Sequence, residues 1–189
     1  SWSTGASVDD AGLVGASGSV VCEPPTPAEV AANPLNRGFI RASDNRRYFV
    51  HADGTPFFWL GDTCWMAAAR VGFADGTFER YFLDRQAKGF NVVLMYVGFP
   101  AWSPEHTGRG GWDPNDYVPN EGGQVFLKNY SLVNPAYFQW LDKRMAWLND
   151  HGFVPYLLPA RRDNIHNPDG MHQEGYWPYL RYCASRYGA

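Results

Sequence analysis

The chain has 189 residues, of which 45% are hydrophobic and 19% are charged, and its formal net charge is −3. This composition excludes a disordered chain, and the absence of a basic stripe gives no reason to expect a nucleic-acid partner. No apolar run approaches the ~20 residues of a membrane span, so no membrane partner is expected either. Three widely spaced cysteines without a CxxC pair indicate neither a disulfide framework nor a zinc site.

The N-terminal part divides by composition. Residues 1–23 are small and polar around one short apolar run, SVVC, and we interpret them as the tail of a preceding β domain. Residues 24–36 contain four prolines and are interpreted as a linker. Residues 37–189 form the main predicted domain. It opens with a predicted hairpin over residues 38–51, because two apolar stretches flank the turn sequence SDNR.

The first strand and helix of the main domain follow. The continuous apolar run PFFWLG at residues 56–61 predicts a strand that is buried on both faces of a parallel sheet. Apolar residues at helical spacing predict a helix over residues 77–88, with Asp75 or Thr77 as N-cap and Gly89 just past its end.

A second strand and helix repeat this order. The run FNVVLMYV at residues 90–97 is β-branched and apolar, which predicts another buried parallel strand. Residues 98–134 are predicted to be a long irregular insert, and their many aromatic residues argue against disorder. Asn134 and Pro135 then provide an N-cap and a first helical residue for a helix that Gly152 ends.

The third unit contains a strand at residues 153–159, which Pro155 weakens because an interior strand needs every N–H. A polar loop over 160–174 leads to a final helix from Tyr176, with Pro178 in its first turn. This alternation predicts a parallel sheet, either in an open doubly wound fold or in the opening part of an eight-fold barrel. The turn after the first strand lacks G-x-G-x-x-G, which disfavours a nucleotide-binding sheet.

Four motifs carry a family resemblance. They are DGTPFFWLGDTCW (53–65), YFLDRQAKGFN (81–91), MAWLNDHGFVPY (145–156) and the pair YWPYL and RYGA within 176–189. In this order they resemble the apiosidase-like glycoside hydrolase domain, a (βα)8 barrel of α/β class, over roughly residues 38–189. Residues 1–23 are similar, more weakly, to the end of the β-sandwich that often precedes such barrels.

The resemblance implies a secreted or periplasmic enzyme that hydrolyses glycosidic bonds of a plant or algal polysaccharide with two carboxylates and no cofactor. A barrel needs about 250 residues, so the chain is expected to supply about three of eight units and to be truncated after them. Both catalytic carboxylates are therefore expected beyond Ala189, and none is assigned within the chain. The loop carboxylates that are present, such as Glu121, give no geometric reason to form a pair.

Barrel enzymes place function at the carboxyl ends of their strands, and three such ends are present. Six residues there are predicted to contact substrate: Asp62 and Trp65 after the first strand, Tyr96 and Trp102 after the second, and Arg161 and His166 after the third. Each has a structural alternative. In that alternative, Asp62 caps a turn and the aromatic rings pack in the core or under the long loop. Arg161 and His166 would then lie in a solvated loop.

Two other functions stay open beside the hydrolase. The first alternative is a non-catalytic carbohydrate-binding fragment. The second is an inactive truncated product that associates with itself through open sheet edges. The expected partner is a carbohydrate, and the isolated chain is expected to be oligomeric or marginally stable. The histidines of the loops show no metal-ligand spacing, so no metal is expected.

Overall fold

The computed structural model describes the chain except residues 8, 10, 12–13, 99, 104–110, 129–131, 161–172 and 189, and describes only the backbone at 100–103, 111–116, 128 and 173–175. Its helices are α1 (Pro27–Ala32), the short 3-10 helix η1 (Pro34–Arg37), α2 (Thr77–Ala87), α3 (Pro135–Asp150) and α5 (Gln173–Tyr187). Its strands are β1 (Trp2–Ser3), β2 (Ser17–Gly18), β3 (Arg41–Ala42), β4 (Phe49–Val50), β5 (Pro56–Phe57), β6 (Gly61–Thr63), β7 (Val92–Tyr96), β8 (Pro100–Ser103), β9 (Gly111–Tyr117), β10 (Phe126–Lys128), β11 (Leu132–Val133) and β12 (Val154–Leu158).

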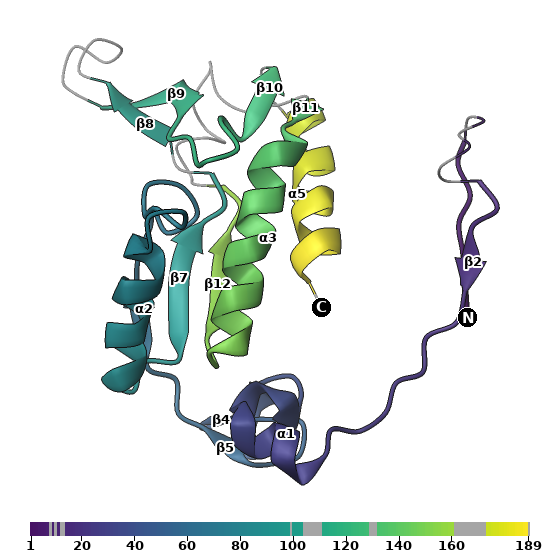
Figure 1. Cartoon of the computed structure of the whole chain (residues 1–189), viewed down its shortest axis with the longest axis vertical. Helices are drawn as coiled ribbons and strands as arrows, with labels where there is room; N and C mark the ends of the chain where they lie inside the picture. Colours follow the sequence, from purple (N-terminus) through teal and green to yellow (C-terminus); the bar gives the residue numbers. More distant parts are fainter. Residues whose placement is uncertain are drawn as a thin grey trace.

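The centre of the molecule is a parallel sheet with the strand order β12-β7-β6 (Figure 1). Both outer strands run parallel to β7, so the predicted parallel sheet is confirmed for these three strands. The three described strands do not close into a barrel. None of the described helices is long and apolar enough to cross a membrane.

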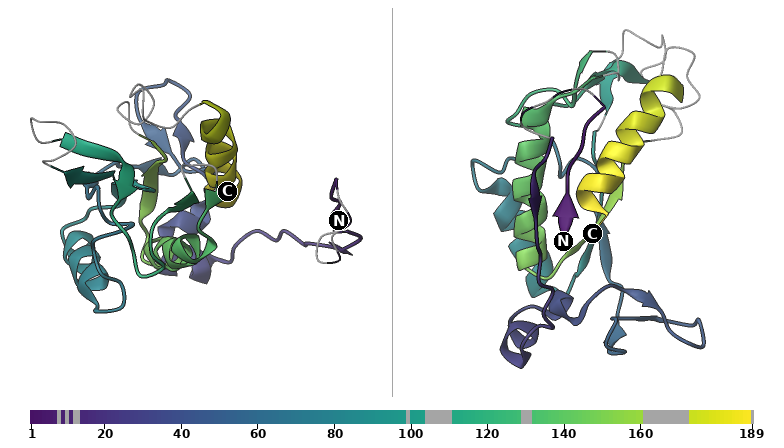
Figure 2. Two further views of the ribbon diagram at one scale, coloured as in Figure 1. Left: turned by 90° about the horizontal axis from the view of Figure 1, so that it is seen from above. Right: turned by 90° about the vertical axis from the view of Figure 1, so that its right-hand side faces the viewer.

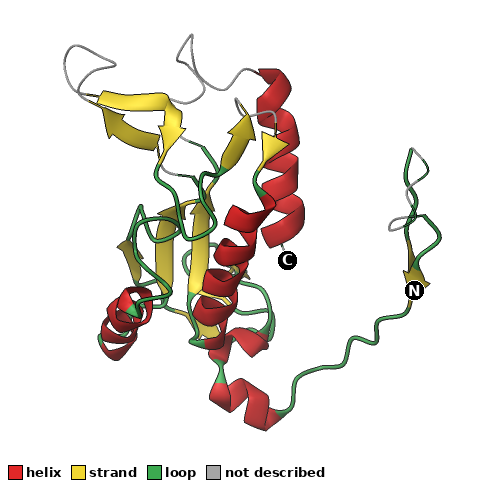
Figure 3. Cartoon of the chain, turned by 45° about the horizontal axis from the view of Figure 1, so that its top comes forward, coloured by secondary structure: helices red, strands yellow, loops and turns green. Residues whose placement is uncertain are grey.

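One face of this sheet is covered by helices. No described helix packs on the other face, which we call the open face, although Val92 is buried there. On the covered face, β7 residues Val93 and Met95 are fully buried in one core with Phe78 and Phe82 of α2 and Leu141 of α3. Helix α5 packs beside α3 in the same core (Figure 3). The alternation of side chains along a strand turns every second residue to the opposite face.

The predicted strand at residues 56–61 is wrong in its extent. Only Pro56–Phe57 is a strand there, and it pairs antiparallel with β4, whereas the parallel strand begins at Gly61. Phe58 and Trp59 lie between the two strands and are 78% and 40% exposed. The chain passes from one sheet to the other within the apolar run, so this run is not buried on both faces.

The other local predictions are confirmed, except for the N-cap of α2. Strands β3 and β4 pair as the expected hairpin. Helix α2 begins at Thr77 as expected, but the prediction of Asp75 or Thr77 as its N-cap is wrong, because Gly76 holds that position. The Asp75 carboxylate, one residue earlier, accepts a hydrogen bond from the Thr77 N–H at 2.9 Å. Helix α3 begins with Pro135, and the Asn134 side chain accepts from the Ala136 N–H at 3.1 Å. Local caps of this kind satisfy N–H groups that have no partner within the helix.

The insert between β7 and α3 is more ordered than the sequence indicated. Its described residues form two antiparallel hairpins, β8 with β9 and β10 with β11. Both hairpins lie beyond the carboxyl end of the parallel sheet (Figure 1). The prediction of an irregular insert is therefore wrong for these strands, because their Gly, Pro and Asp residues hide the alternation that marks a strand.

Pro155 and Pro178 differ in how they fit the elements that contain them, and only Pro155 lies where its element can accept it without loss of a hydrogen bond. Strand β12 is an edge strand of the described sheet, and its Val154 N–H donates to the Asn91 carbonyl at 2.8 Å. Because N–H groups alternate in direction along a strand, Pro155 removes no bond to β7. Helix α5 begins at Gln173, so the prediction that Pro178 lies in the first turn is wrong, and this proline is inside the helix.

The N-terminal residues lie apart from the rest of the molecule (Figures 1 and 2). Strands β1 and β2 form an exposed hairpin, and Val20 and Val21 after it are 76% and 79% exposed. The segment expected to be a linker contains α1, which starts with a capping box between Thr26 and Glu29. The division into a β tail, a linker and a main domain stays a prediction.

Candidate functional site

Two of the predicted substrate-contacting rings meet at the carboxyl end of the sheet. Trp65 follows β6 and Tyr96 ends β7, and the Tyr96 N–H donates to the Trp65 carbonyl at 3.1 Å. Their ring centroids are 6.4 Å apart, with the planes inclined at 70°. The Trp65 side chain is 48% exposed, and Tyr96 is partly buried. We call these two side chains the aromatic pair.

The aromatic pair has a packed support on the Tyr96 side. Ala69 and Val118 are buried, and the partly buried side chains of Met66 and Tyr96 pack against them. Met66 and Ala69 belong to the loop after β6, whereas Val118 follows β9. The position of the Tyr96 ring thus depends on two segments that are far apart in the sequence.

Asp62 is turned away from the aromatic pair. It is in register with Val93, so its side chain lies on the face of the sheet that helices cover. One carboxylate oxygen accepts a hydrogen bond from the Tyr81 hydroxyl at 2.6 Å and lies 3.2 Å from Nε of Arg85. The other oxygen accepts from the Thr63 N–H at 2.7 Å. These contacts favour the structural alternative for Asp62, and a sugar contact by this residue stays a prediction.

The side chains of the other three predicted residues lie outside the described part. The backbone of Trp102 pairs with Trp112 in the β8–β9 hairpin, but its side chain is outside the described part. Arg161 and His166 lie outside the described residues altogether. Their roles in substrate binding therefore stay predictions.

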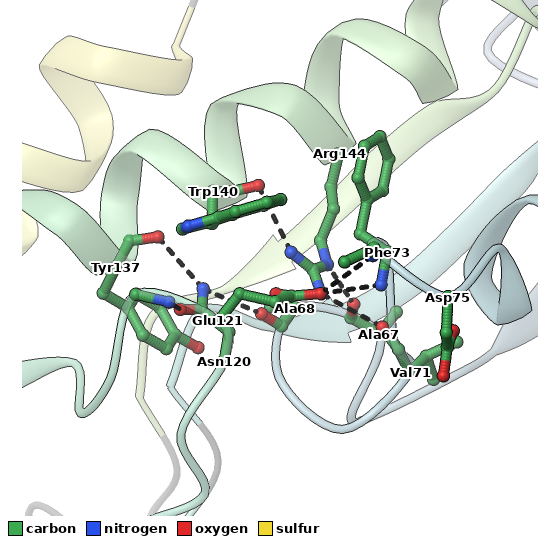
Figure 4. A network of polar contacts seen from close by, with 12 residues as sticks. Ala67, Ala68, Val71, Phe73, Asp75, Asn120, Glu121, Tyr137, Trp140 and Arg144 are labelled. Carbon is green, nitrogen blue, oxygen red and sulfur yellow. Dashed lines mark hydrogen bonds and ion pairs between the residues drawn. The ribbon is translucent and has the colours of Figure 1, made fainter.

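A buried arginine that the sequence analysis missed organises the loops at this end (Figure 4). Arg144 of α3 is fully buried, and its Nε donates to the Ala67 carbonyl at 3.1 Å. Its Nη2 donates to the Val71 carbonyl at 3.0 Å and to the Glu121 carboxylate at 2.8 and 3.0 Å. A buried charge needs such partners. The sequence offered no signal for them, because the residue lies at an ordinary position on a helix.

Glu121 completes this network from the other side. Its carboxylate also accepts hydrogen bonds from the N–H groups of Phe73 at 2.7 Å and Ala74 at 3.3 Å. Burial by itself raises the pKa of Glu121, but backbone N–H groups and the Arg144 guanidinium outweigh it and hold this pKa below its usual value. A general acid needs a raised pKa, so Glu121 does not fit that role.

Two buried tyrosines hold the ends of the strands. Tyr137 of α3 donates to the Val97 carbonyl at 2.6 Å, and Tyr179 of α5 donates to the Pro159 carbonyl at 2.9 Å. Both carbonyls follow directly after a parallel strand, where the ladder ends. The floor of the candidate site is therefore fixed by hydrogen bonds from both helices.

Within the described residues, no group of three or more His, Cys, Asp or Glu side chains is arranged to hold a metal ion. Two carboxylates described near this end, those of Asp62 and Glu121, are both paired with arginines. Trp65 of the aromatic pair is 48% exposed and suits a ligand with apolar faces.

Comparisons with known proteins agree in the type of domain. A family model described as "Apiosidase-like, catalytic domain" matches residues 43–189. One solved glycoside hydrolase is 23% identical and has a TM-score of 0.59 over 82% of this chain and 32% of its own. A glycoside hydrolase family 5 structure from Bacteroides vulgatus ATCC 8482 is 20% identical, with a TM-score of 0.65 over 82% of this chain and 31% of its own.

Both structures are less than 25% identical to this chain, so the similarity indicates a shared fold and nothing more specific. The chain spans about a third of the length of the solved structures that it matches, 32% and 31%. No curated protein matches the chain.

Proposed function

Since this chain belongs to the apiosidase-like catalytic domain family, we propose that it is part of a glycoside hydrolase that acts on a plant or algal polysaccharide or oligosaccharide. Within this enzyme, residues 37–189 would contribute loops that contact the substrate. The family relationship supports a hydrolase, and the substrate class rests on the resemblance of the sequence motifs. We further propose that the whole protein is secreted or periplasmic.

The proposed architecture is a (βα)8 barrel, of which this chain supplies the opening units. The open face of the sheet supports it, because Leu94 and Tyr156 are in register there and no described helix covers them. Tyr156 is 48% exposed and touches Trp59 edge to face at 6.2 Å. Apolar residues of this kind fill the interior of a barrel. Left open, the same face and the sheet edges would promote self-association of the isolated chain.

The observation that carries the proposed function is the aromatic pair at the carboxyl end of β6 and β7. In barrel enzymes this is the end that binds substrate. The C–H groups on the flat side of a sugar ring pack favourably on the electron-rich face of an aromatic ring. Trp65, with about half of its side chain exposed, is suited to such a contact. Trp102, Arg161 and His166 are proposed to add further contacts from the neighbouring loops.

The proposed reaction uses two carboxyl groups, one as general acid and the other as nucleophile or general base. Asp62 and Glu121 are poor candidates for the general acid, because Arg85 and Arg144 respectively hold them as ion pairs. We propose that the catalytic pair comes from a part of the enzyme outside residues 1–189. The alternative function is sugar binding without turnover, which the arginine pairing of both carboxylates favours for the chain taken alone.

The experiment is calorimetric titration of the chain with cellohexaose, xylohexaose and laminarihexaose, together with an assay for new reducing ends. Trp65→Ala is expected to weaken binding about tenfold or more, which corresponds to about 1.4 kcal/mol. Trp2→Ala is the matched control, since this tryptophan is 47% exposed in the remote N-terminal hairpin, against 48% for Trp65. Equal affinities of the two variants would remove Trp65 from the site. Binding without new reducing ends supports the sugar-binding alternative for the isolated chain.

A further inference from the structure

We propose that the ion pair between the buried Arg144 and Glu121 is a positioning device for the aromatic pair. In this proposal Arg144 does not touch the ligand. It acts through the two backbone segments that pack behind Tyr96. The link to sugar binding rests on the proposed function, whereas the link to the conformation of the aromatic pair does not.

Arg144 binds the loop after β6 at two carbonyl groups, one on either side of the residue that supports Tyr96. The guanidinium donates to the carbonyls of Ala67 at 3.1 Å and Val71 at 3.0 Å. Ala69, which packs with Tyr96, lies between these two acceptors. The same loop begins immediately after β6 with Cys64 and Trp65. Fixing both carbonyls therefore fixes the segment that carries one ring and supports the other.

Glu121 connects the second supporting segment to the same guanidinium. Its carboxylate binds Nη2 of Arg144 at 2.8 Å, and its backbone lies three residues after Val118. Asn120, between Val118 and Glu121, anchors the same segment. Its side-chain amide donates to the carbonyls of Ala68 at 3.3 Å and Tyr137 at 3.0 Å (Figure 4). One arginine thus ties together the two segments, around Ala69 and Val118, against which Tyr96 packs.

The choice of arginine has a physical reason. A guanidinium presents up to five N–H donors in a rigid planar fork, so a single side chain can satisfy several carbonyls and a carboxylate at fixed angles. Here it also donates from Nη1 to the Trp140 carbonyl at 3.3 Å. A lysine at this position keeps the charge but offers three donors from one point. Such a lysine cannot reach Ala67, Val71 and Glu121 in the same arrangement.

The test compares Arg144→Lys with Arg186→Lys in the 189-residue chain labelled with 5-fluorotryptophan. Arg186 pairs with Asp142, with Nε 2.8 Å from the carboxylate, and joins α3 to α5. It is therefore an arginine–carboxylate pair that also holds α3, through Asp142, and its described contacts are to α3 and α5 and not to the aromatic pair. The ¹⁹F resonance of Trp65 is assigned by its loss in Trp65→Phe.

The Arg144→Lys variant is expected to shift or broaden the Trp65 resonance and to raise the Kd for the bound hexasaccharide about tenfold or more. The Arg186→Lys variant is expected to lower the melting temperature while leaving the Trp65 resonance and the Kd unchanged. If Arg144→Lys does not fold, Glu121→Gln replaces it, because the amide oxygen can still accept from the Phe73 N–H while the charge is lost. Asp142→Asn is then the matched control.

An unchanged Trp65 resonance in a folded Arg144→Lys or Glu121→Gln protein overturns the proposal. So does an equal change in the Arg186→Lys or Asp142→Asn control, because that result indicates general loosening of the fold. Absence of binding by the wild-type chain to any of the three hexasaccharides counts against the proposed function alone. In that case the Trp65 resonance still decides whether Arg144 positions the aromatic pair.

Discussion

Replacing Tyr137 by Phe removes one hydroxyl from the centre of the molecule and leaves the ring in place. This hydroxyl is buried and donates to the Val97 carbonyl at 2.6 Å, just past the end of β7. Val97 is itself fully buried, so water does not replace the lost donor. The change tests whether helix α3 holds the carboxyl end of the sheet.

The magnitude follows from the unpaired carbonyl that remains. Leaving a buried acceptor without a partner costs about 1–3 kcal/mol of the free energy of unfolding. For a chain of 150–250 residues, each kcal/mol lowers the melting temperature by about 2–4 °C. The Tyr137→Phe variant is therefore expected to melt about 2–12 °C below the wild type.

The assay is urea denaturation followed by circular dichroism, with thermal melting as a second measurement. Tyr182→Phe is the control, because this hydroxyl accepts a hydrogen bond from Arg186 at 3.1 Å in an exposed setting. Surface changes of this kind alter stability by about 0.5 kcal/mol or less. If the two variants lose the same stability, the Tyr137 hydroxyl does not hold the strand end and the reasoning is refuted.

Two further predictions concern close packing and pH. In Gly122→Ala, the new Cβ would lie 2.3 Å from the Ala136 carbonyl oxygen. The start of α3 must therefore move, and denaturation should show a loss of about 1–3 kcal/mol, whereas Gly5→Ala, with open space around it, should show none. Burial raises the pKa of both Tyr137 and Tyr179 above the usual value near 10. The two neutral hydroxyl groups therefore contribute fully to the free energy of unfolding below about pH 10, and this contribution is lost as the pH rises further. Denaturation midpoints that stay constant from pH 8 to 11 would contradict this.

The sequence predicted most of the regular elements of the main domain. Helix α3 was recognisable because Asn134, Pro135 and Gly152 mark its ends and its apolar residues recur at helical spacing. Strand β7 was recognisable from its continuous β-branched run. The strand near Gly61 was placed several residues too early, because an apolar run does not show where a chain passes from one sheet to another.

The candidate site was predicted only in part. The sequence placed Trp65 and Tyr96 after consecutive strands, and the structure brings their rings together. It also suggested Asp62, but register within the sheet turns that carboxylate towards α2. A shift of one residue along a strand reverses the face on which a side chain lies, so position near a strand end does not determine direction.

By itself, the sequence determined the family, the alternation of the parallel strands with α2 and α3, and the ends of these two helices. These properties depend on residues within a few positions of one another, where capping and periodicity act. Only the tertiary structure decided that Arg144 is buried, that it binds Glu121, and that both lie behind the Tyr96 support. Such contacts join residues that are 23 or more positions apart in the chain. They exist because the packing of α3 against the loops leaves one buried charge, which only a partner from another segment can satisfy.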